Sequence, residues 1–322
     1  AVAHARARAA PRTARAAPLL VLEALARGKP KQVAKAPGVV AGAVGALCEL
    51  IAEPVGAPGG APPTDGTGAG AEEASNSDED EDGEIPVPTL AAQALDVLAL
   101  HLPAKAVLPP AMAFAQAALG AADNPRARRA GCVALLVVAE GCAEPLRAAL
   151  PAALAIVAAG LRDPLPSVRG QAAFALGQLA EHCQPDMASH IGSALPPVLD
   201  LLASAPRGTA AQQACYALEV MCDALDDAGL EAADVLRPHL PSLVPALVGA
   251  LAGGDAETRH SALGALASAA AAAGSGFAAH APAVLPALSH FMQAGGEPGS
   301  DEIRLRARAT EAAGVVAATL GR

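Results

Sequence analysis

Aromatic residues are almost absent from this chain of 322 residues, which has no tryptophan, one tyrosine and four phenylalanines. Its hydrophobic residues make up 53% of the total and are therefore mainly alanine, leucine and valine. Alanine has the highest helix propensity, and small side chains let neighbouring helices approach closely. Alternation of apolar and polar residues is nearly absent, so no strand is expected. These absences predict an all-α protein without a β-sheet.

Signatures of catalysis, secretion and membrane insertion are also missing. The six cysteines form no C-x-x-C pair and no disulfide framework, which favours free, mostly buried thiols in a reducing compartment. The eight histidines show no metal-binding spacing, and no catalytic constellation is found. We therefore expect no enzyme activity, no metal and no cofactor. The stretch without acids or bases between Arg259 and Glu297 is broken by prolines, so no membrane insertion is expected.

A proline returns at nearly constant intervals of 42, 45, 49 and 41 residues. The recurring residues are Pro109, Pro151, Pro196, Pro245 and Pro286. Each opens a short apolar stretch of helical character, and a period of about 40–47 residues is typical of HEAT or armadillo repeats. We therefore predict a right-handed α-solenoid of HEAT repeats, built from antiparallel helical hairpins. Such proteins bind partners along an extended surface and rarely catalyse reactions.

Composition divides the chain into three parts. Residues 1–54 are predicted to form a HEAT-like hairpin with helices over Arg12–Arg27 and Gly38–Glu53. Residues 55–88 are a proline- and glycine-rich acidic linker without apolar periodicity, which predicts disorder. Residues 89–322 are predicted to form about five HEAT repeats and a trailing helix.

Within the third part, each hairpin has a first and a second helix. The first helices are expected over residues 89–101, 125–141, 164–183, 209–226, 255–273 and 301–320. The second helices are expected over residues 104–119, 145–161, 187–203, 235–251 and 280–292. Asp255 and Asp301 are expected to be N-caps, and Pro125 and Pro164 to lie in a first turn.

An arginine followed by small residues recurs early in the first helices, at Arg169, Arg259 and Arg304. One hypothesis makes these residues ligand contacts. The other makes them a polar ladder between neighbouring repeats. We favour the ladder because the spacing follows the repeat. Its candidate partners are Asp163, Asp255 and Asp301.

The net charge of −10 is concentrated in one acidic run within the linker. The run contains Glu72, Glu73, Asp78, Glu79, Asp80, Glu81, Asp82 and Glu84. A charge run is usually a solubilising linker, but an insertion that interrupts a repeat array often lies on the binding side. Dense negative charge attracts basic partners, so we predict partner contact here. Ser75 and Ser77 stand before four acids, a context that acid-directed kinases prefer, so they are candidate phosphorylation sites or ordinary linker serines.

The first 35 residues are basic, but no aromatic residues accompany the charges for base stacking. Direct nucleic-acid binding is therefore not expected. The solvated outer face of a helix is the favoured interpretation of this segment.

Several segments resemble a known family. Residues 166–181 with Gln184-Pro185 resemble a hairpin of the importin-β (karyopherin-β) nuclear transport receptors. Residues 213–219, and the acidic run followed by residues 91–103, resemble the importin-4-like branch of that family. The chain is thus identified as a central segment of such a receptor.

The resemblance implies import of basic protein cargo, of the histone or ribosomal-protein type, with release by Ran GTPase. It implies nucleoporin contacts by the full-length receptor and shuttling between cytoplasm and nucleus. It further implies that the acidic run lies near the cargo and Ran surfaces, and that second helices line the concave face. The alternative is another kind of HEAT scaffold, such as a phosphatase regulatory subunit, which has no need of a long acidic insert.

Overall fold

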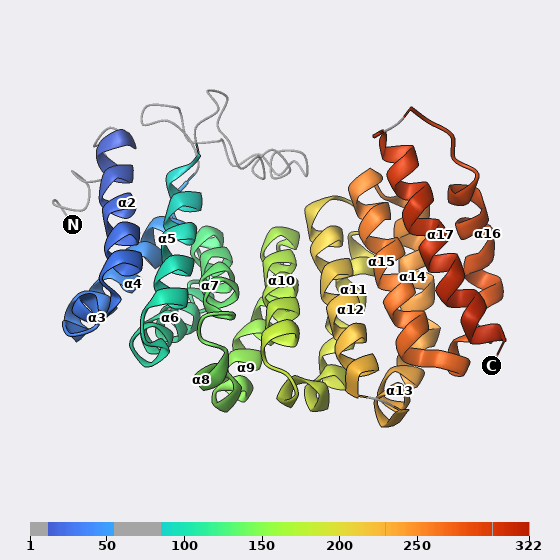
Figure 1. The fold of residues 1–322 in the computed structure, drawn as a ribbon, viewed down its shortest axis with the longest axis horizontal. Coiled ribbons are helices and arrows are strands. Elements are labelled where there is room, and N and C mark those ends of the chain that lie inside the picture. The colour runs from blue at the N-terminus through green and yellow to red at the C-terminus, as the bar shows by residue number, and fades with distance from the viewer. Residues whose placement is uncertain (1–11, 55–84, 229, 298, 322) are drawn as a thin grey trace. The chain divides into compact units, whose positions relative to one another are not determined.

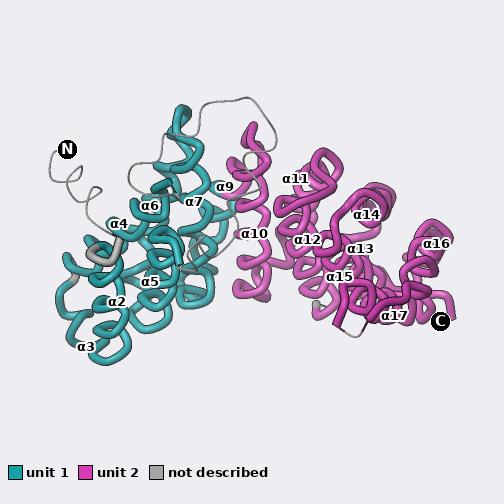
Figure 2. The backbone as a smooth tube through the Cα atoms, turned by 90° about the horizontal axis from the view of Figure 1, so that it is seen from above, with its two compact units in different colours: residues 1–156 teal, residues 157–322 magenta. Residues whose placement is uncertain are grey.

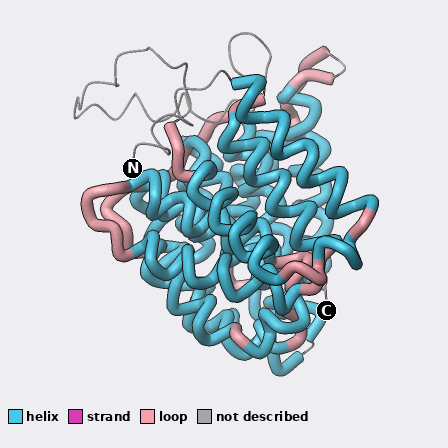
Figure 3. The backbone as a smooth tube through the Cα atoms, turned by 90° about the vertical axis from the view of Figure 1, so that its left-hand side faces the viewer, coloured by secondary structure: helices cyan, strands magenta, loops and turns pink. Residues whose placement is uncertain are grey.

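The computed structural model of the chain describes residues 12–54, 85–228, 230–297 and 299–321 (Figure 1). Among these residues the elements are helices joined by turns and loops, with no strand (Figure 3). The chain divides into two compact units, residues 1–156 and 157–322, and the boundary falls inside one helix (Figure 2). The all-α prediction is confirmed.

Unit 1 is a set of antiparallel helical hairpins. Its helices are α2 (Arg12–Gly28), α3 (Pro30–Val33), α4 (Pro37–Ile51), α5 (Val87–His101), α6 (Ala104–Leu119), α7 (Pro125–Val138), α8 (Ala143–Ala148) and the start of α9 (Leu150–Leu161). Helix α5 packs against α2 and α7, while α4 packs against α6. Leu47, Leu95, Leu98 and Leu135 are almost fully buried between them. The ion pair between Arg15 and Glu53 ties α2 to the segment that follows α4.

Unit 2 continues with the same hairpin plan. Its remaining helices are α10 (Pro166–His182), α11 (Ile191–Ser204), α12 (Gly208–Ala228), α13 (Leu230–Leu236), α14 (Leu240–Gly253), α15 (Ala256–Ala273), α16 (Ala281–Met292) and α17 (Asp301–Leu320). Short 3-10 turns η2 (Asp186–His190), η3 (Arg237–His239) and η4 (Gly274–Phe277) precede α11, α14 and α16.

The helices of unit 2 form two rows. We call α10, α12, α15 and α17 the first-helix row, and α11, α14 and α16 the second-helix row (Figure 2). Neighbours lie closer together in the first-helix row than in the second. A Cβ atom on Gly177 of α10 would lie 3.3 Å from the Cα atom of Ala217 in α12. Because a stack curves toward its more closely spaced row, the first-helix row is the inner side of unit 2.

The recurring proline marks the second helices, as predicted. Pro151 is the second residue of α9, whereas the other four lie inside their helices. Pro109, Pro196, Pro245 and Pro286 are each the sixth residue of their helix. An interior proline removes one backbone hydrogen bond and costs about 3 kcal/mol relative to alanine. All four side chains are exposed, so water can solvate the carbonyl that loses its partner.

Several predicted boundaries are wrong for local reasons. The helix expected to begin at Pro164 begins at Pro166, because the Asp163 side chain accepts a hydrogen bond from the Leu165 amide and holds a turn. Leu165 is extended, as a residue before proline tends to be. The helix expected over residues 145–161 is divided at Ala149 into α8 and α9. The N-cap of α17 is Ser300, not Asp301.

One segment, residues Ala233–Gly253, is long and apolar enough to cross a membrane by length and composition alone. It is not one regular helix, because η3 separates α13 from α14. Leu243, Val244 and Leu247 are buried in unit 2, which is the pattern of a core helix.

The close approach within the first-helix row can be tested at Gly177. A Cβ atom there would meet the Tyr216 ring at 2.5 Å, so G177A is expected to lower the free energy of unfolding by about 1–3 kcal/mol through overpacking. Urea denaturation of the whole chain measures the change. The matched control is G249A in α14, where a Cβ atom meets nothing within 4 Å. The control should gain up to about 1 kcal/mol from helix propensity. Equal effects of the two variants would contradict the assignment of the close row.

Candidate partner-binding surface

The segment that the sequence assigns to partner contact lies outside the described residues. This applies to the whole acidic run, Glu72–Glu84, and to Ser75 and Ser77. The six predicted ladder residues are all described, and all belong to unit 2. The candidate surface therefore consists of the first-helix row of that unit.

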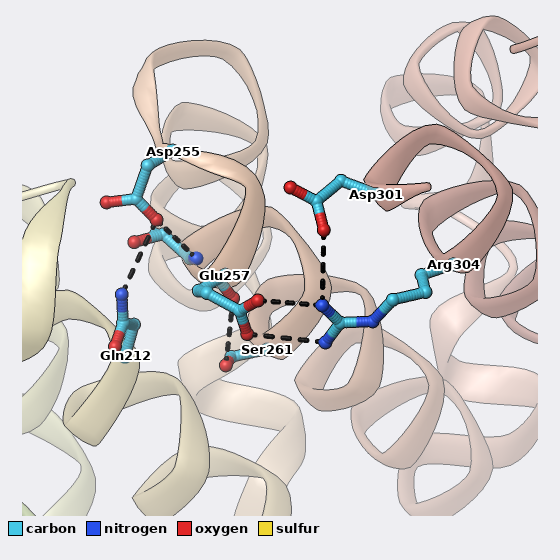
Figure 4. A network of polar contacts seen from close by, with 7 residues as sticks. Gln212, Asp255, Glu257, Ser261, Asp301 and Arg304 are labelled. Carbon is cyan, nitrogen blue, oxygen red and sulfur yellow. Dashed lines mark hydrogen bonds and ion pairs between the residues drawn. The ribbon is translucent and has the colours of Figure 1, made fainter. Parts of the chain in front are cut away.

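Asp255 connects two neighbouring helices of the row (Figure 4). Its Oδ1 atom accepts a hydrogen bond of 2.7 Å from the Thr258 amide and so caps α15. Its Oδ2 atom accepts one of 3.1 Å from the Gly208 amide, at the start of α12. Burial alone would raise the pKa of Asp255, but these amide hydrogen bonds outweigh it and lower the pKa. One carboxylate thus satisfies amides at the beginning of two helices.

Arg304 makes the next connection along the row (Figure 4). Its two terminal nitrogens contact the two oxygens of Glu257 in α15, at 2.8 Å and 3.4 Å. Its Nη1 atom also lies 3.2 Å from Asp301 Oδ1. The hydrogen bond from Arg304 is the main cause of the lowered pKa of Glu257. Both side chains are about half exposed, so water and salt screen the pair and it adds little to stability.

The other two predicted ladder arginines close the turn that precedes their own helix, where one hairpin joins the next. Arg169 Nη1 donates to the carbonyls of Asp163 and Pro164, each at 3.0 Å. Arg259 Nε donates to the Leu251 carbonyl at 3.2 Å. The repeated arginine therefore has two structural settings. At positions 169 and 259 it holds the turn before its helix, and at 304 it contacts the neighbouring first helix.

A second set of contacts on this row was not expected from the sequence. Tyr216 of α12 donates a hydrogen bond of 2.7 Å to Glu181 of α10 and accepts one from Gln178. The rings of Phe174 and Tyr216 pack in a T-shaped arrangement, with centroids 5.1 Å apart. Residues 213–219 carry part of the family resemblance, but a role for this tyrosine requires knowing which helix lies beside it.

The C-terminal half of α12 is acidic. The helix has no lysine or arginine, and its four acids are Glu219, Asp223, Asp226 and Asp227. Their spacing of four, three and one residues places them along one side of the helix. Burial is the largest cause of the raised pKa of Asp223, and the charges of Asp227 and Asp226 add to it. Carboxylates in the last turns also oppose the helix dipole, so these acids do not stabilise the end of the helix.

The cysteines and histidines do not form a reactive site in the described ranges. All six cysteines are free and buried, as predicted. Burial raises the pKa of Cys48 and Cys215 to about 12, so these thiols stay neutral near pH 7. No group of three or more histidines, cysteines, aspartates and glutamates suited to a metal ion occurs among the described residues.

Comparison with known proteins places these features in a family context. No family model matches the chain. Over 119 residues, or 37% of the chain, it is 40% identical to human importin-4, and the match spans 11% of that protein. It is 29% identical over 164 residues to the probable importin subunit beta-4 of Schizosaccharomyces pombe, spanning 14% of that protein. The chain thus matches only a small part of these relatives.

Solved structures of karyopherins share the fold. Kap121p bound to Pho4p superposes with a TM-score of 0.78 at 23% identity, covering 97% of this chain and 28% of Kap121p. Kap121p bound to RanGTP gives a TM-score of 0.75 at 22% identity, covering 94% of this chain and 28% of Kap121p. The HEAT solenoid prediction is confirmed by this likeness.

Because Asp255 caps two helices, replacing its side chain should destabilise the fold. D255A should lower the free energy of unfolding by about 1 kcal/mol, because amides of α15 and α12 lose their acceptor. D255N should lose less, because asparagine also caps helices. Urea denaturation at pH 7 measures both variants.

The same variants predict a pH dependence. The pKa of Asp255 is lower in the folded chain than its ordinary value. The carboxylate therefore stabilises the fold at pH values above the ordinary pKa, and this stabilisation is lost as the pH falls through the pKa of the folded chain. The difference between wild type and D255A should therefore shrink below about pH 4. A difference that grows on acidification would contradict the capping role.

Proposed function

We propose that the chain is a segment of a nuclear import receptor of the importin-β family, in its importin-4-like branch, and that it binds basic protein partners. The partners contact the inner, first-helix row of unit 2 and the acidic run of residues 72–84. The observation that carries the proposal is the 40% identity to human importin-4, together with the fold shared with karyopherins.

The charge distribution supports a basic partner. The acidic run holds eight acids, and α12 adds four acids without a lysine or arginine. Asp223, Asp226 and Asp227 are exposed and available to a cationic side chain. In physiological salt the screening length is about 8 Å, so the acids act mainly on partners already near the surface. Histone tails and ribosomal proteins have the required charge.

The full-length receptor would also contact Ran GTPase and nucleoporins and shuttle between cytoplasm and nucleus. The supporting observation is that Kap121p, which has the same fold over this region, has been solved bound to RanGTP. Release of cargo by Ran GTPase in the nucleus would complete the transport cycle.

Neutralising the end of α12 should weaken partner binding while the fold becomes no less stable. D226N/D227N removes two exposed charges near the negative end of the helix dipole, so stability should stay equal or rise by a few tenths of a kcal/mol. Affinity for a fluorescent lysine- and arginine-rich histone-tail peptide should fall roughly two- to tenfold, since an exposed charge pair contributes up to about 1 kcal/mol. Fluorescence anisotropy measures it.

The matched control is D200N, which removes an exposed acid from α11 in the second-helix row. It should leave peptide affinity nearly unchanged. An equal loss in D200N and D226N/D227N would show that net charge, and not the inner row, determines binding.

Deletion of residues 72–84 tests the acidic run separately. The deletion should reduce affinity strongly at an ionic strength of about 0.01 M, where the screening length is about 30 Å, and less at about 0.15 M. Equal binding by wild type and the deletion variant at both salt concentrations would contradict a role of the acidic run in partner binding.

Phosphorylation of Ser75 and Ser77 would add about −1.5 to −2 charges each and so tighten basic-peptide binding. The test treats the chain with an acid-directed kinase and repeats the anisotropy titration. S75A/S77A is the control that cannot respond. Unchanged affinity after complete phosphorylation would contradict the regulatory role.

A further inference from the structure

Arg308 of α17 reaches across α15 to Glu219 of α12. The Nη2 atom of Arg308 lies 2.5 Å from Glu219 Oε1, although the two residues are 89 positions apart. Its Nη1 atom lies 2.8 Å from Glu311, one turn further along α17. The contact therefore spans three successive helices of the first-helix row.

Gly264 of α15 provides the space for this contact. A Cβ atom at Gly264 would lie 2.4 Å from Arg308 Nη2 and 2.6 Å from Glu219 Oε2. The ion pair thus lies directly above the backbone of the middle helix, where any side chain would displace it. This places it on the inner row, beside the acidic half of α12.

The pair is poorly suited to stabilising the fold. Both side chains are only 25% exposed, so each charge has lost much of its water. The Nε–H group of Arg308 is buried and has no hydrogen-bond partner among the described residues. Burial is the largest cause of the raised pKa of Glu219, and it outweighs the opposing effect of Arg308. Without Arg308, the partly desolvated carboxylate of Glu219 would remain beside Asp223 and could pair with another cation.

We propose that the Arg308 guanidinium occupies the position beside the Glu219 carboxylate that a basic side chain of the partner takes on binding. The partner must therefore displace Arg308. The contact is autoinhibitory, because it neutralises an acid of the binding row within the free chain. This inference rests on the proposed function, since it concerns the same partner class and the same surface.

The test compares peptide affinity in three variants of the 322-residue chain. R308Q should bind a lysine- and arginine-rich peptide about three- to tenfold more tightly than wild type, because Glu219 becomes available. E219Q/R308Q should lose that gain, because the freed carboxylate is absent. The matched control is R304Q, which makes the same change in net charge but breaks the exposed pair with Glu257 on the same row. It should gain less than twofold.

Each outcome has a distinct meaning. An equal gain in R304Q and R308Q would overturn the inference, since long-range charge alone would explain it. A gain that persists in E219Q/R308Q would also overturn it, since Glu219 would not be the competing group. If none of the proteins binds the peptide, the proposed partner class is wrong as well.

Circular dichroism verifies folding, and R308K replaces R308Q if the latter unfolds. Lysine lacks the second donor arm that contacts Glu311, so R308K should also gain affinity.

Discussion

The close packing of α10, α12, α15 and α17 is the constraint on which the rest of unit 2 depends. Alanine and glycine at the contacts bring these helices together, and nearly all of the buried residues of α15 are alanine, leucine or glycine. Without large aromatic side chains to fill wider gaps, the core can be dense only if the backbones approach closely. The spacing then brings polar side chains within hydrogen-bond distance across neighbouring repeats, and even across three helices where Gly264 leaves room.

This packing separates the two faces of unit 2 by chemistry. The second-helix row carries the exposed prolines and few charges, while the first-helix row carries the caps, the ion pairs and the acids of α12. The closer spacing of the first-helix row puts that row on the inner side of this unit, whereas the second helices were expected there. Some contacts of the first-helix row stabilise the stack, as Asp255 does. Others are unfavourable for the free chain, such as the carboxylates at the end of α12, and such groups are typical of binding surfaces.

Much of the fold could be predicted from the sequence. The proline period and the alanine-rich composition gave the helical hairpins, and two helices, 104–119 and 301–320, have the predicted bounds. A local hydrogen bond decided one boundary where prediction failed, at Leu165. The contacts of Tyr216 and of Arg308 could not be foreseen, because they join residues 35 and 89 positions apart. A repeat period shows which helices are equivalent, but not which side chains meet.

A basic partner is expected to bind on the first-helix row of unit 2. Hydrogen–deuterium exchange of the whole chain, with and without a lysine- and arginine-rich peptide, tests it most directly because it locates the contact without any substitution. Slower exchange is expected in the C-terminal half of α12 and in the facing turns of α15 and α17, with α11, α14 and α16 unchanged. Slower exchange confined to the second-helix row, with the first-helix row unaffected, would contradict it.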